Sequence, residues 1–91
     1  MATKINAVGS FAKSLTDYER VCLEEGDTLR LLIAPISLCG KYTKEFSMLM
    51  SFGAQYDSKI GWSIVVDGAD GFNKVAEQLD GYECGGFYRV H

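Results

Sequence analysis

The clearest pattern in the chain lies in residues 45–66, EFSMLMSFGAQYDSKIGWSIVV. Large apolar side chains occupy every second position on either side of a polar break. They are Phe46, Met48, Met50 and Phe52 before the break, and Ile60, Trp62, Ile64 and Val66 after it. A period of two is typical of a strand with one buried face. Because residues 53–59 are rich in turn-forming types, the pattern predicts a hairpin with strands over 45–52 and 60–66.

The apolar run that precedes this hairpin is TLRLLIA, residues 28–34, and Pro35 follows it. Proline has no N–H for a sheet ladder, so the run predicts a strand that stops there. Residues 36–43, which include Gly40, are expected to form a turn into the hairpin. Three strands joined by short turns favour an antiparallel arrangement.

The segment that follows the hairpin changes from the period of a strand to that of a helix. DGADG, residues 67–71, breaks the strand, and Asp70 is expected to cap a helix over residues 70–80. The apolar positions of this helix are Phe72, Val75, Ala76 and Leu79. Their spacing places them on one face, and Gly81 is expected to end the helix.

The N-terminal part of the chain predicts a second helix. Residues 1–9 are weakly patterned, and a helical period then runs from Ser10 to a C-terminal cap at Gly26. One face of that helix carries Phe11, Leu15, Tyr18 and Cys22. Thr16 and Glu19 also have the spacing of a capping box, so a start of the helix at Thr16 remains open.

The tail of the chain, residues 82–90, is expected to form the last strand, with a bulge at Gly85-Gly86. The order α-β-β-β-α-β predicts one domain, residues 1–91, with an α+β two-layer sandwich fold. We expect an antiparallel sheet of three to four strands with two helices on one face. The other face then carries an apolar line of Leu32, Leu49 and Val65. That line is either an open interaction surface or is covered by a loop or the N-terminal arm.

The order α-β-β-β-α resembles that of the double-stranded-RNA-binding domain. Members of that family carry a cluster of lysines where the second helix begins. In this chain the corresponding place holds DGADG, residues 67–71, followed by the single Lys74. Because an RNA duplex is recognised largely through its phosphates, we expect no RNA binding.

Composition limits the compartment and the class of protein. An apolar fraction of 47% over 91 residues excludes a disordered chain. No apolar run approaches the roughly 20 residues of a membrane helix, and the N-terminus lacks the apolar region of a secretory signal. Cys22, Cys39 and Cys84 form no C-x-x-C pair. We therefore expect free thiols and a cytoplasmic location. If the protein is viral, this location is the cytoplasm of the host.

The sequence predicts neither a catalytic site nor a metal or cofactor. The single histidine is His91, the last residue, where a general base is hard to position. Asp67, Asp70 and Glu77 do not have the spacing of a calcium loop. The glycines near Asp70 lack a G-x-G-x-x-G or Gly-Lys-Ser/Thr pattern, and the two aspartates would repel a phosphate.

Charge is distributed unevenly and favours a protein partner. Residues 17–27 and residues 67–83 each carry a net charge of -4, whereas residues 28–66 carry +2. The dense lysines and arginines that nucleic acid requires are absent, so we expect no direct nucleic-acid binding. The acidic segments predict attraction to a larger protein or complex with a basic surface. The predicted contacts are Asp17, Glu24, Glu25, Glu77, Asp80 and Tyr56.

These features predict a small, non-enzymatic protein-binding module that inhibits a nucleic-acid-binding defence complex. Small acidic inhibitors encoded by viruses, such as anti-CRISPR proteins, are similar in size and charge. A second hypothesis is a homodimer that pairs through Leu32, Leu49 and Val65 and holds a small molecule. A third is a small enzyme that uses Cys39 or a tyrosine.

Overall fold

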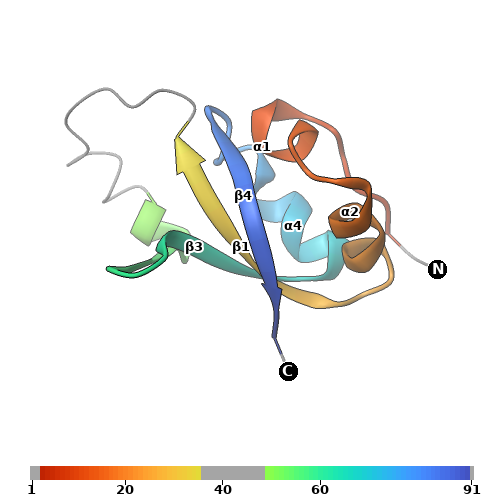
Figure 1. The fold of residues 1–91 in the computed structure, drawn as a ribbon. Helices are drawn as coiled ribbons and strands as arrows, with labels where there is room; N and C mark the ends of the chain where they lie inside the picture. Colours follow the sequence, from red (N-terminus) through yellow and green to blue (C-terminus); the bar gives the residue numbers. More distant parts are fainter. Residues whose placement is uncertain (1–2, 36–48, 91) are drawn as a thin grey trace.

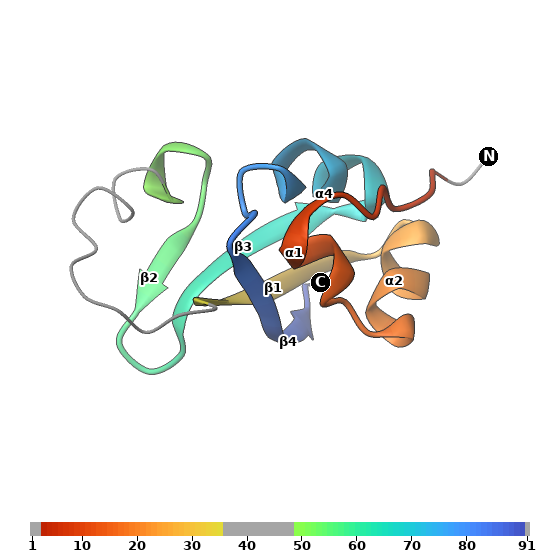
Figure 2. The ribbon, with the colours of Figure 1, turned by 90° about the horizontal axis from the view of Figure 1, so that it is seen from above.

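The computed structural model describes residues 3–35 and 49–90 of the chain. In this part, four antiparallel strands form one sheet in the order β2-β3-β1-β4. The strands are β1 (Thr28–Pro35), β2 (Gln55–Asp57), β3 (Gly61–Asp67) and β4 (Tyr82–Arg89). The helices α1 (Gly9–Lys13), α2 (Asp17–Glu24) and α4 (Gly68–Ala76) lie on one side of the sheet (Figure 1, Figure 2). The predicted α+β class is therefore confirmed.

The two central strands, β1 and β3, follow the predicted alternation. Leu31 pairs with Ile64 and Leu29 with Val66, and all four side chains are buried against the helices. The core that they share with the helices also contains Phe11, Leu15, Cys22, Leu23, Ile33, Phe72, Ala76 and Leu79. The rings of Phe11 and Phe72 stack with their centroids 5.9 Å apart, which joins α1 to α4.

The predicted helix from Ser10 to Gly26 is two helices. The chain leaves the helical conformation at Thr16, whose backbone is extended at φ -73° and ψ 162°. The Thr16 N–H donates to Glu19 Oε1 at 2.8 Å, and the Glu19 N–H donates to Thr16 Oγ1 at 3.2 Å. This capping box satisfies two backbone donors, which explains why α2 starts afresh there. Its end at Gly26 is as predicted.

The predicted strand over residues 45–52 is wrong in its described part. Residues 49–51 are helical, and residues 45–48 lie outside the described residues. Leu49 is buried whereas Met50 is 65% exposed, so the two side chains face the opposite way from the prediction. The Gly53 N–H donates to Met50 O and the Ala54 N–H to Leu49 O, which closes a helical turn. A short apolar run fits either period, and here tertiary packing selected the helix.

Further boundaries differ from the sequence prediction. β2 lies inside the predicted turn of residues 53–59. Helix α4 ends at Ala76, before the predicted end at residue 80. It begins at Gly68 rather than at Asp70, and its N-cap, Asp67, makes no side-chain capping bond. The bond that replaces it runs from the Gly68 N–H to Asp27 O at 2.9 Å. A contact between distant segments therefore sets the start of this helix, and a local cap does not.

The bulge in β4 is confirmed. Leu31 pairs with Phe87 and Ile33 with Cys84, so Gly85 and Gly86 together oppose Leu32. Gly86 has a φ of +144°, a conformation that residues with a side chain rarely adopt. The extra residue reverses the alternation along β4, which keeps both Cys84 and Phe87 on the core side.

The helix-free side of the sheet only partly matches the predicted apolar line. Leu32 and Val65 lie on it, but Leu49 belongs to the core at 2% exposed. The N-terminal arm does not cover this face. The Ile5 N–H instead donates to Glu24 Oε2 at 2.8 Å and the Asn6 N–H to Asn73 Oδ1 at 3.0 Å, which holds the arm on the helical layer.

No helix within residues 3–35 and 49–90 is long and apolar enough to cross a membrane. Cys22 and Cys84 are both free thiols. The predicted turn over residues 36–43, with Cys39, lies outside the described residues, as does His91.

Candidate functional site

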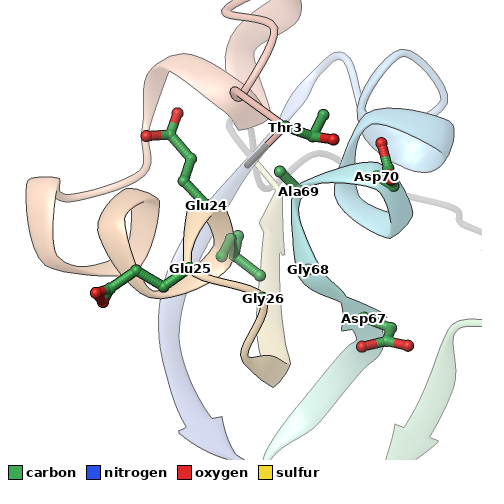
Figure 3. A pocket seen from close by; sticks show the side chains of 9 residues that line it. Thr3, Glu24, Glu25, Gly26, Asp67, Gly68, Ala69 and Asp70 are labelled. Carbon is green, nitrogen blue, oxygen red and sulfur yellow. The ribbon is translucent and has the colours of Figure 1, made fainter. Parts of the chain in front are cut away.

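A hollow lies between the end of α2 and the start of α4. It has a volume of about 680 Å³ and is open to solvent. Its lining residues come from three segments: Thr3, Leu23, Glu24, Glu25, Gly26, Asp67, Gly68, Ala69 and Asp70 (Figure 3). The sequence predictions Glu24 and Glu25 thus share a site with Asp67 and Asp70, which the sequence assigned to a turn and a helix cap.

Two glycines allow the ends of the helices to meet at this hollow. The Asp27 N–H donates to Cys22 O and the Gly26 N–H to Leu23 O, and Gly26 has a φ of +98°. These two bonds form the Schellman motif, which closes α2. Gly68 has a φ of +69°, and a Cβ there would lie 3.5 Å from Gly26 Cα. The hollow therefore has a floor made of closely packed backbone.

Four carboxylates surround the floor, and we call Glu24, Glu25, Asp67 and Asp70 the acidic rim. Glu24 and Glu25 come from α2, while Asp67 and Asp70 come from the junction of β3 with α4 (Figure 3). The four side chains point away from one another rather than into a common centre (Figure 3). In agreement, no cluster in the described residues could hold a metal ion. The arrangement suits contact with a broad surface.

Two of the rim carboxylates are held by neutral donors and two are free. Glu24 accepts from the Ile5 N–H, and Asp67 Oδ1 accepts from Thr28 Oγ1 at 2.9 Å. The side chains of Glu25 and Asp70 form no hydrogen bond or ion pair with the described part of the chain. Among residues 3–35 and 49–90, no cation therefore neutralises any of the four.

The neighbouring Asp27 behaves differently because Arg89 lies beside it. The Arg89 guanidinium is 3.7 Å from Asp27 Oδ2, and it also donates to Tyr18 Oη at 2.9 Å and to Cys22 Sγ at 3.2 Å. The bond to Cys22 is the main reason why the pKa of Arg89 is raised, followed by the charges of Tyr18 and Cys22. Arg89 is therefore committed to the interface between α2 and β4.

The other predicted contacts are dispersed. Asp17 begins α2, at the end of the helix away from the rim, and Glu77 follows α4 on its far side. Tyr56 is on β2, on the opposite side of the molecule from α2 (Figure 2), where its ring meets Trp62 edge-on at 5.5 Å. The structure does not bring these residues to the hollow.

Asp80 has a structural role that the sequence did not suggest. Its Oδ1 accepts from the Ser10 N–H at 3.0 Å and from Ser10 Oγ at 3.3 Å, across 70 residues. The backbone bond from Ser10 is the first cause of the lowered pKa of Asp80. The carboxylate thus ties the turn after α4 to the start of α1.

A second carboxylate that serves the fold is Glu19, which is 3% exposed. Its Oε2 accepts from Cys84 Sγ at 3.2 Å, while Oε1 holds the Thr16 N–H. Burial raises the pKa of the Cys84 thiol to about 12, and the adjacent Glu19 adds to the effect. A thiol with so high a pKa is a hydrogen-bond donor and not a nucleophile at neutral pH.

Comparison of this chain with protein-family models, with curated proteins and with solved structures finds no match to any of them.

Proposed function

We propose that the protein is a small protein-binding module whose acidic rim docks on the basic surface of a larger protein. The preferred surface is one that otherwise holds nucleic acid, since carboxylates spaced around a rim can occupy sites for phosphates. An inhibitor of a nucleic-acid-binding defence complex would act in this way. The binding itself would involve no chemistry by this chain.

The observation that carries the proposal is the lack of internal neutralisation at the rim. Within residues 3–35 and 49–90, the one ion pair is Arg89 with Asp27, outside the rim. Like charges gathered on a surface destabilise a fold slightly, so a fold gains nothing from leaving them together. A basic partner would remove that repulsion.

The α2 end of the hollow adds to the negative potential. Helix α2 ends there with no basic residue in its last turn, and the carbonyl groups at a helix C-terminus carry a partial negative charge. Helix α4 begins at the same hollow, and the partial positive charge of its first N–H groups opposes this contribution. The full charges of the four rim carboxylates therefore dominate and favour a partner with lysine or arginine side chains.

The test is a quantitative pull-down from a host extract with the full chain as bait. The rim variant Glu25→Lys/Asp70→Lys should lose the captured protein. The control Asp17→Lys/Glu77→Lys makes the same change of charge at exposed sites away from the hollow and should retain it. Capture should weaken as salt rises, because surface charges are screened.

Added nucleic acid should compete for the captured protein. Capture that survives the rim substitutions, or that falls equally in the control variant, would remove the acidic rim as the docking surface. Capture that is insensitive to salt would do the same.

A further inference from the structure

On the face of the sheet that points away from the helices, the side chains form three rows that run across the strands. The first row contains Val65, Arg30 and Tyr88, which are aligned by the strand register. The second contains Ser63, Leu32 and Gly85, and the third Ala34 and Glu83. We call these eight residues the open face, in which Ser63 is only 1% exposed and accepts a hydrogen bond from Arg30. Residues paired across antiparallel strands point to the same side of the sheet, so each row presents its side chains together.

The open face has an apolar centre. Val65 is 43% exposed and Tyr88 is 52% exposed on either side of Arg30, and Leu32 and Ala34 are partly exposed in the two following rows. A connected group of such side chains is typical of an interaction site. The acidic rim is separate from this group, so the open face needs its own partner.

Gly85 indicates that the partner approaches closely. Unlike Gly86, Gly85 does not have a left-handed backbone conformation. A Cβ at Gly85 would meet Ala34 Cβ at 3.7 Å and Leu32 Cβ at 3.9 Å, which are ordinary contacts. The fold of the single chain therefore does not require glycine there. Gly85 also lies in the bulge opposite Leu32, and the absence of a side chain there leaves room for another surface to approach.

The charges of the open face identify the partner as a second copy. The Arg30 guanidinium donates to Gln55 Oε1 and Ser63 Oγ, both at 3.3 Å, and has no carboxylate beside it among the described residues. The exposed Glu83 has no cation beside it in the described part of the chain. Glu83 pairs with Ala34, four residues along β1 from Arg30, or about 13 Å at the rise of a strand. One unpaired charge of each sign thus lies on either side of Leu32.

We propose that two copies of the chain pair through the open face about a two-fold axis that crosses the strands at Leu32. This axis reverses the direction of the strands, so Arg30 of each copy meets the Ala34 and Glu83 row of the other. Leu32 then packs on Leu32, and the two Gly85 residues leave room beside it. An axis parallel to the strands would instead stack Arg30 on Arg30, which like charges disfavour.

The first measurement is sedimentation equilibrium of the full chain from 1 to 500 µM, roughly the range in which weak dimers dissociate. The wild-type chain should be a dimer at the upper end. Arg30→Glu and Glu83→Arg should each raise the dissociation constant at least tenfold. The matched controls Lys74→Glu and Glu77→Arg make the same charge changes on the helical layer and should leave it unchanged.

The decisive measurement mixes the two single variants. One copy then carries glutamate at both positions and the other carries arginine at both, so the proposed axis forms two opposite-charge pairs. The mixture should form a heterodimer at least as tight as the wild-type dimer. A loss of folding in either variant could not produce this rescue.

The variant Gly85→Val distinguishes an effect on dimer affinity from an effect on the stability of the single chain. Its melting temperature should be unchanged or higher, because valine favours strands, while its dimer should weaken at least tenfold. A wild-type chain that stays monomeric at 500 µM, or a mixture of the two charge variants that does not associate, would overturn the proposal. A Gly85→Val dimer as tight as the wild type would also contradict it.

Discussion

The two ends of helix α2 use carboxylates in opposite ways. At its start, Glu19 is buried, and its two oxygens accept from the Thr16 N–H and the Cys84 thiol. At its end, Glu25 is exposed and forms no hydrogen bond or ion pair through its side chain with the described residues. Helix α2 and its C-cap residue therefore include one acid that the fold needs and another that it does not use.

The comparison shows why acidic composition alone is a poor guide to a binding surface. Both residues contribute equally to the formal charge, but burying a carboxylate is tolerated only when donors satisfy it. A surface carboxylate with no partner is free to bind one. Substitutions at the two ends should therefore have very different effects on stability and on binding.

The largest effect on stability is expected at the buried end. Glu19→Ala removes the capping box and leaves the Cys84 thiol without its carboxylate acceptor, which should lower the free energy of unfolding by about 2–4 kcal/mol. Urea denaturation followed by circular dichroism measures it. Glu19→Gln keeps an acceptor for the Thr16 N–H and should lose less than half as much. Equal losses in the two variants would show that the cap is not the source of the stability.

The backbone beneath the acidic rim should be the next most sensitive. Gly68→Ala imposes a strained φ and brings a Cβ to 3.5 Å from Gly26 Cα, so we expect a loss of about 1–2 kcal/mol. Gly26→Ala imposes the same kind of strain with nothing within 4 Å, so its loss should be smaller, about 1 kcal/mol. The difference in the loss of stability between the two variants, measured by thermal melting, gives the cost of placing a Cβ where the helix ends meet. A larger loss in Gly26→Ala would contradict the described packing.

The Cys84 thiol predicts a loss of stability at high pH. Its pKa is about 12 in the folded chain against an ordinary 9.0, so the unfolded chain releases this proton first. Stability should be complete below pH 9 and fall as the pH rises toward 12, with a slope of at most about 1.4 kcal/mol per pH unit. Because the thiol is only partly buried, solvent screening should make the slope smaller than this limit. Cys84→Ser should remove this component, and an unchanged pH profile in that variant would assign the loss elsewhere.

The smallest effect on stability is expected at the acidic rim, where the effect on binding should be largest. Glu25→Gln/Asp70→Asn should change the free energy of unfolding by less than about 0.5 kcal/mol, since neither side chain has a partner among the described residues. A small gain is expected because repulsion within the rim decreases. Thermal melting at low and high salt measures both. A clear loss of stability would mean that these side chains support the fold.

The agreement between sequence and structure was best where both the period and the local chemistry pointed to one answer. The strands β1 and β3 follow the predicted alternation, each with one buried face. Thr16 with Glu19 marks the start of α2, which the sequence had left open as an alternative to one helix from Ser10. Such features depend on neighbouring residues, and these are available in a single sequence.

The main failure occurred within the segment whose period of two was the clearest. Residues 49–52, LMSF, suit a strand face or a single helical turn, and their packing selected the turn. The acidic rim was half predicted, since Glu24 and Glu25 were identified, whereas Asp67 and Asp70 were assigned to a break between elements. The sequence DGADG could have indicated an acidic turn, but it could not show that this turn lies beside Glu24 and Glu25.

From sequence alone, the chain was assigned an α+β fold, a helix that closes at Gly26 and an excess of acid in two segments. The meeting of those segments depends on contacts across the chain, such as the bond from Gly68 to Asp27 and that from Thr28 to Asp67, 39 residues apart. Secondary-structure propensity, helix capping and local charge depend on residues that are close in sequence, so they can be predicted from the sequence alone. Which acids are buried, paired or left facing solvent follows from how the helices pack on the sheet, because burial and pairing are properties of the folded surface.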